Sequence, residues 1–135
     1  MSPQTILVVD DNLASRRLMR LILDRGGYRV LMAKDLDKAL ALCRGHIKFD
    51  LLIVDAILST GHGKLVAECF EELRTGVPIL FTSGQPLPVL HRKGLLDSAA
   101  LQRGKISFLQ KPFTVMGLLT TVSEILREPR TFIAR

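Results

Sequence analysis

The chain has 135 residues, of which 47% are hydrophobic and 24% are charged. This length and composition indicate one globular domain spanning residues 1–135, and they exclude a disordered, fibrous or collagen-like chain. The formal net charge is +6, but the basic residues are spread along the whole chain, and only one Tyr, six Phe and no Trp are present for base stacking. Nucleic-acid binding is therefore not expected.

No segment has the features of a membrane anchor. Apolar runs such as residues 6–9 and 51–54 are far shorter than the ~20 residues that span a bilayer, and residues 1–5 lack the basic start of a secretion signal. We therefore expect a cytoplasmic protein without membrane contact. Cys43 and Cys69 have no further Cys or His at metal-ligand spacing, so two buried thiols are expected rather than a disulfide or a zinc site.

Short apolar runs alternate about five times with amphipathic stretches of helical length. Such alternation is typical of a parallel sheet whose strands are covered by helices on both faces. The expected strands are residues 5–10, 29–33, 51–55, 79–82 and 107–109.

Capping residues and glycines predict where the helices begin and end. Asn12 is expected to cap a first helix that runs to Arg25, before Gly26 and Gly27, with Leu18, Leu21 and Ile22 as its apolar stripe. Further helices are expected over residues 35–43, 63–73 and 114–126, with a shorter helical stretch over 97–102. The rest of 87–105 is expected to be a loop. The folded core then covers about residues 5–126, and residues 127–135 form a C-terminal tail.

Polar side chains follow four of the five predicted strands. Because the carboxyl ends of parallel strands meet at one edge of a doubly wound sheet, where ligands bind, these side chains are expected to lie together. Each one alone is explained by an ordinary cap or turn, but their joint occurrence indicates a functional site. They are Asp10 and Asp11 after the first strand, Asp55 after the third, Thr82 after the fourth, and Lys111 with Pro112 after the fifth.

Four segments closely resemble the receiver domain of two-component response regulators. They are residues 7–12 (LVVDDN), 51–55 (LLIVD), 79–84 (ILFTSG) and 108–113 (FLQKPF). The resemblance extends over about residues 5–126. It implies an α/β, flavodoxin-like fold: a doubly wound five-stranded parallel sheet of order 2-1-3-4-5 with about five flanking helices.

The resemblance also implies a role for each site residue. Asp55 matches the phosphoacceptor, Lys111 the lysine that contacts the phosphoryl group, and Thr82 and Phe108 the switch pair. Mg²⁺ is the implied cofactor, and the peptide bond before Pro112 is expected to be cis. The implied metal ligands are Asp10, Asp11, Asp55 and the backbone carbonyl of Ile57.

These residue types suit reversible phosphorylation. A carboxylate can act as a nucleophile toward phosphorus and hold the phosphoryl group as a labile acyl phosphate. Clustered carboxylates repel one another, and a hard divalent cation relieves that repulsion while it neutralises charge on the transferring group. The expected protein is a signalling module and not an enzyme, beyond assisting its own phosphorylation and dephosphorylation.

The implied partners are a histidine kinase or histidine phosphotransfer protein as donor, and a downstream protein target. Arg16, Arg17 and Arg20 are either contacts for the donor or an ordinary solvated face of the first helix. The sequence does not decide whether the protein forms a homodimer. It also does not decide between a stand-alone regulator and the receiver of a hybrid histidine kinase.

Two other functions share part of this pattern, a phosphorylation-independent receiver and a phosphatase. A phosphorylation-independent receiver that serves only as an interaction module often lacks an acidic residue, the acceptor or the lysine, and all of these are present here. A haloacid-dehalogenase-type phosphatase needs a second Asp two residues after its nucleophile, whereas Asn12 stands two residues after Asp10.

The chain departs from the family pattern in two places. Ser59 stands where the family often has Pro, four residues after the acceptor, in a loop that also carries His62. His62 is expected to be solvated rather than to contact the phosphoryl group. Thr82 and Lys111 are 29 positions apart, and the additional residues fall within 86–105, which puts the usual output surface in doubt.

Overall fold

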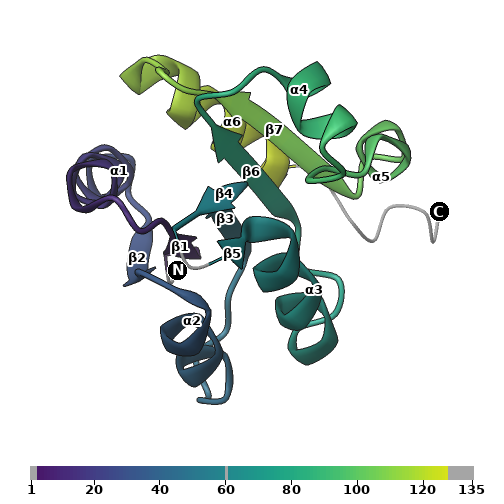
Figure 1. Ribbon diagram of the computed structural model, residues 1–135. Coiled ribbons are helices and arrows are strands. Elements are labelled where there is room, and N and C mark those ends of the chain that lie inside the picture. Colours follow the sequence, from purple (N-terminus) through teal and green to yellow (C-terminus); the bar gives the residue numbers. More distant parts are fainter. Residues whose placement is uncertain (1–2, 60, 128–135) are drawn as a thin grey trace, which may run out of the picture.

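A parallel sheet carries helices on both of its faces in the computed structural model, which describes residues 3–59 and 61–127 (Figure 1). Its strands run in the order β2-β1-β3-β6-β7, and every neighbouring pair is parallel. The predicted order 2-1-3-4-5 is confirmed. The strands are β1 (Thr5–Val9), β2 (Arg29–Ala33), β3 (Leu51–Asp55), β6 (Ile79–Ser83) and β7 (Ile106–Gln110).

Six helices connect and flank these strands in the part of the chain that the structure describes. Four of them begin at a side-chain cap: Asn12 accepts a hydrogen bond from the amide of Ser15, Asp35 from that of Lys38, Asp97 from that of Ala99, and Thr114 from that of Gly117. Such caps satisfy amides that have no partner within the helix. The helices are α1 (Leu13–Arg25), α2 (Leu36–Cys43), α3 (Gly63–Leu73), α4 (Leu87–Arg92), α5 (Ser98–Gln102) and α6 (Val115–Arg127).

The two faces of the sheet bury separate apolar clusters. One cluster joins Ile6, Val8 and Ile53 to residues of α1 and α6. The other lies on the opposite face, where α2, α3 and α4 pack on the sheet (Figure 1). Among the residues described, no helix is both long and apolar enough to span a lipid bilayer.

The expected apolar stripe of α1 is partly wrong. Leu18 and Leu21 are each 49% exposed, and the buried side chains are Met19, Ile22 and Leu23. Ser15 in the first turn bonds Asp10 at the sheet edge, and the residues four and seven positions after Ser15 lie on the same face of the helix and are buried.

The expected loop before residue 97 was also wrong, because α4 forms there. Pro86 and Pro88 favour a loop by composition, but Pro86 is the N-cap of α4 and Pro88 lies in its first turn, where a missing amide hydrogen costs no helical bond. A two-stranded antiparallel ribbon of β4 (Ile57–Leu58) and β5 (Gly61–His62) was not anticipated. Both cysteines are free, with Cys43 buried and Cys69 only partly so.

Candidate functional site

Asp10 lies directly after β1 and is fully buried. Its Oδ1 accepts a hydrogen bond from the amide of Asn12 at 2.9 Å. Its Oδ2 accepts from Ser15 Oγ at 2.7 Å and from Lys111 Nζ at 2.8 Å. A buried carboxylate with three such donors is held in one orientation.

Asp55 ends β3, next to Asp10 across the sheet edge, and remains partly exposed. Its Oδ2 accepts from Lys111 Nζ at 2.9 Å and its Oδ1 from the amide of Ile57 at 3.0 Å. Burial raises the pKa of the Asp55 carboxyl, against the opposing effects of the Ile57 amide and the Lys111 ammonium. One ammonium therefore serves two carboxylates, only one of which is open to solvent.

Lys111 reaches the site from the end of β7. Its amide donates to the Ser83 carbonyl at 2.8 Å, and the peptide bond between Lys111 and Pro112 is cis, as expected. Burial disfavours the charged ammonium, but hydrogen bonds to Asp10 and Asp55 outweigh it and raise the pKa of Lys111. The side chain is thus a fixed cation between β1 and β3.

Thr82 pairs with Asp55 on the neighbouring strand and is fully buried. Its carbonyl accepts from the Ala56 amide at 2.8 Å. Within the described residues, its hydroxyl is the one buried side-chain polar atom that has no hydrogen-bond partner. Buried polar groups are nearly always paired, so an unpaired hydroxyl at this position needs an explanation. It is free to bond a ligand at the sheet edge.

Asp11, the second residue of the acidic pair, is held by the loop after β3. Its carboxylate accepts a hydrogen bond from the Ser59 amide in the loop after β3, and hydrogen bonding to Ser59 lowers the pKa of the Asp11 carboxyl. Proline in place of Ser59 would have no amide hydrogen to donate. In residues 3–59 and 61–127, no three Asp, Glu, His or Cys side chains converge closely enough to hold a metal ion.

Two residues at the site were missed by sequence reasoning. Ser15 contacts both Asp10 and Lys111, at 2.7 and 3.1 Å. Arg16 donates from Nη1 to the Asp10 carbonyl at 2.6 Å, a contact at the site that the sequence did not predict. Their position in the first helical turn after an acidic pair was the available signal.

Phe108 and His62 lie outside this cluster. Phe108 is half-buried, pairs with Phe81 on the neighbouring strand and packs against the core cluster under α2 and α3. His62 is exposed and precedes α3 without a side-chain capping bond.

Comparison with known proteins points to one family. Residues 6–123 match the sequence profile of the response regulator receiver domain. The transcriptional regulatory protein CpxR of Klebsiella pneumoniae subsp. pneumoniae (strain HS11286) is 33% identical over 124 residues, which are 90% of this chain and 49% of that protein. The chain thus spans about half the length of this curated relative.

Solved structures agree with this match. The response regulator receiver domain protein (CheY-like) of Methanospirillum hungatei JF-1 has a TM-score of 0.79 and 28% identity, covering 94% of this chain and 96% of that one. The receiver domain of the hybrid histidine kinase CckA has a TM-score of 0.72 and 27% identity, covering 90% and 98%.

Proposed function

Because this chain belongs to the response regulator receiver domain family, a family of signalling modules, we propose that it accepts a phosphoryl group on Asp55. The donor is a phosphohistidine of a kinase or phosphotransfer protein in the cytoplasm. The observation that carries the proposal is the Lys111 ammonium shared by Asp10 and Asp55, beside the unpartnered hydroxyl of Thr82.

In the proposed transfer, an Asp55 carboxylate oxygen attacks phosphorus. The bond from phosphorus to the donor's imidazole nitrogen breaks, and its electron pair leaves with the imidazole. Phosphoryl transfer depends mainly on positioning and on neutralising charge, so Lys111 pairs with one phosphoryl oxygen. Thr82 donates its free hydroxyl to another.

The donor atoms around Asp55 fit Mg²⁺, because all are hard carboxylate or carbonyl oxygens. Asp10, Asp11, Asp55 and the Ile57 carbonyl would hold the ion. Asp11 would first leave the Ser59 amide that it now contacts. When bound, the ion supplies positive charge that neutralises the transferring phosphoryl oxygens. Asp10 contributes a carboxylate that is fixed in one orientation by its bonds to Asn12 and Ser15.

The proposed switch links Thr82 to Phe108. As the Thr82 hydroxyl moves toward the phosphoryl group, it vacates space behind β6, and Phe108 fills that space. Phe108 is already half-buried against the core, so we propose that phosphorylation increases the population of its inward conformation only modestly. A Thr82→Ala variant should still be phosphorylated but should show a reduced response on the β6 and β7 surface.

The proposed docking face for the phosphodonor protein lies on α1. Leu13, Leu18 and Leu21 are about half-exposed there, next to the exposed Arg17 and Arg20. Exposed apolar side chains within a charged surround are typical of protein contacts. The helix starts beside Asp10, so a protein bound to this face has its reactive group near Asp55.

Intact-mass measurement tests the proposed function. Incubation with a small acyl phosphate and Mg²⁺ should add one phosphoryl group, and a chelator should prevent the addition. Asp55→Asn should abolish the mass shift, whereas the control Asp37→Asn, at an exposed carboxylate of α2, should behave as the parent. Undiminished phosphorylation of Asp55→Asn would overturn the assignment of the acceptor.

The ligand assignment has a separate test. In Asp11→Ala, one of the few charged oxygen donors is removed, so Mg²⁺ affinity should fall when measured by titration calorimetry. An unchanged titration curve would show that Asp11 is not a ligand.

A further inference from the structure

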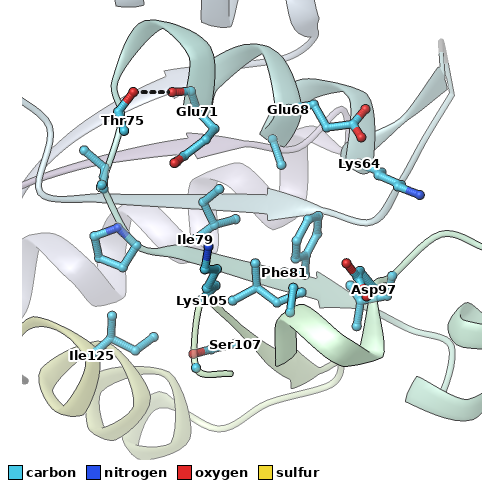
Figure 2. A pocket seen from close by; sticks show the side chains of 18 of the residues that line it. Lys64, Glu68, Glu71, Thr75, Ile79, Phe81, Asp97, Lys105, Ser107 and Ile125 are labelled. Carbon is cyan, nitrogen blue, oxygen red and sulfur yellow. Dashed lines mark hydrogen bonds between the residues drawn. The ribbon is translucent and has the colours of Figure 1, made fainter. Parts of the chain in front are cut away.

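A groove of about 920 Å³ lies away from the acidic site, between α3 on one side and α5, β7 and the end of α6 on the other (Figure 2). Its floor is apolar, with Ile79 and Phe81 of β6 at the centre. The groove includes the amino ends of β6 and β7, whereas Asp55 and Thr82 stand at the carboxyl ends of their strands.

The groove exists because the crossover after β6 covers the sheet incompletely. Its two helices have six and five residues, and no residue of α5 is buried. The loop between them places Leu95 and Leu96 against the core, but it leaves the surface beside Ile79 and Ile106 open. Lys64 of α3 reaches Gly94 of that loop, with 3.4 Å between its Nζ and the carbonyl oxygen.

The rim of the groove is acidic, although the chain as a whole carries a formal charge of +6. Four carboxylates and two lysines line the groove, and in the described part of the chain none of the four forms an ion pair. An apolar floor with an acidic rim suits a segment that has bulky apolar side chains between basic ones. The carboxylates are Glu68, Glu71, Asp97 and Glu124.

We propose that residues 128–135 of this same chain, EPRTFIAR, bind in the groove, with Phe132 and Ile133 on its floor. Arg130 and Arg135 flank this apolar pair and match the acidic rim. No other stretch outside the described residues combines these features, since those residues are otherwise only 1–2 and 60.

The point of attachment favours this segment over a separate partner. Glu124 and Ile125, in the last turns of α6, already line the groove, so the chain leaves the helix at its edge. Phe132 lies five residues beyond Arg127, which at roughly 3.3 Å per residue is a reach of about 17 Å. Tethering at this distance gives a high effective concentration, which compensates for the short length of the segment.

A single tryptophan reports on this contact, because the chain has none of its own. In Phe132→Trp, acrylamide should quench the indole several-fold less than it quenches a free peptide of residues 128–135 carrying the same substitution. Adding Glu71→Lys should raise quenching toward the peptide value. The matched control is Glu72→Lys, an equally exposed neighbour on α3 that does not line the groove, and it should leave quenching unchanged.

Four results would overturn the proposal. Quenching equal to that of the free peptide would show that the segment stays in solvent. Equal effects of Glu71→Lys and Glu72→Lys on quenching would show that the segment does not contact the groove. Protection of the indole that grows with protein concentration would show that the groove binds a second copy of the chain. In the unmodified chain, nuclear Overhauser contacts from the Phe132 ring to the Ile79 and Ile106 methyl groups should be seen, and their absence would also contradict it.

Discussion

The crossovers that follow β1 and β6 leave the same edge of the sheet but are built differently. After β1, one helix of 13 residues is capped by Asn12 and buries Met19, Ile22 and Leu23. After β6, two short helices are separated by a loop, and within them only Leu90 of α4 is buried. The difference shows that one long capped helix covers the sheet, whereas a divided crossover leaves a groove beside it.

The two strand ends differ in a second way. At the end of β1, Asp10 accepts three hydrogen bonds and is fixed before any ligand arrives. At the end of β6, the buried Thr82 hydroxyl has no partner among the described residues. The β1 end is therefore preorganised, and the β6 end is where we expect movement on phosphorylation.

The largest predicted effect concerns the buried leucines of the two crossovers, Leu90 in α4 and Leu23 in α1. It tests whether α4 packs on the sheet as tightly as α1 does. Leu90 and Leu23 both have 0% exposure. Each change to alanine should lower the free energy of unfolding by about 2–5 kcal/mol, through lost burial and the cavity that remains. Urea unfolding measures both. A much smaller effect of Leu90→Ala than of Leu23→Ala would show that α4 packs loosely.

The end of β3 adds a third case, in which backbone contact limits the residue type. A Cβ on Gly63 would lie 2.0 Å from the Asp55 carbonyl oxygen. Gly63→Ala should therefore destabilise the fold by about 1–3 kcal/mol, because the start of α3 must move away from β3. Gly84→Ala is the control, since its Cβ would meet nothing within 4 Å. Thermal unfolding should separate the two variants, and equal stability would contradict this contact.

The unpartnered hydroxyl of Thr82 predicts a gain in stability. Thr82→Val keeps the side-chain shape and removes a buried polar group that has no hydrogen bond, so the unphosphorylated protein should be more stable by about 1–3 kcal/mol. Thr121→Val is the control, because the Thr121 hydroxyl donates to the Gly117 carbonyl at 2.8 Å and its loss brings no gain. Destabilisation of Thr82→Val in urea would show that the hydroxyl has a partner in solution.

Helix starts give the smallest predicted effect. Asp35 caps α2 through the Lys38 amide, so Asp35→Ala should cost about 1 kcal/mol. Asp37→Ala in the same first turn removes only a charge near the helix start and should cost ~0.3 kcal/mol. Chemical denaturation of both variants distinguishes capping from charge. Equal costs would mean that the Asp35 bond does not stabilise the helix.

Sequence patterns predicted best where local chemistry decides the structure. Buried strands are continuous apolar runs, and Asn12, Asp35 and Asp97 mark helix starts, so the strand positions and most helix bounds were correct. The sheet order, which the family resemblance implied, was also correct. The placement of Asp10, Asp55, Thr82 and Lys111 at one edge follows from the parallel sheet.

The remaining features depend on contacts between distant segments. The face that α1 turns to the sheet is the one that carries Ser15, which bonds Asp10. The Asp11 carboxylate is bonded by the Ser59 amide, 48 residues away. No periodic pattern in the sequence predicts either contact. The groove beside β6 arises from what the short helices fail to cover, which no residue pattern encodes directly.

The proposed function depends most directly on which residue is phosphorylated. After incubation with a small acyl phosphate and Mg²⁺, borohydride reduction converts an aspartyl phosphate to homoserine, and tandem mass spectrometry of the digest locates it. We predict homoserine at position 55 and at no other aspartate. Modification of Asp10, Asp11 or another carboxylate, with Asp55 unchanged, would contradict the account.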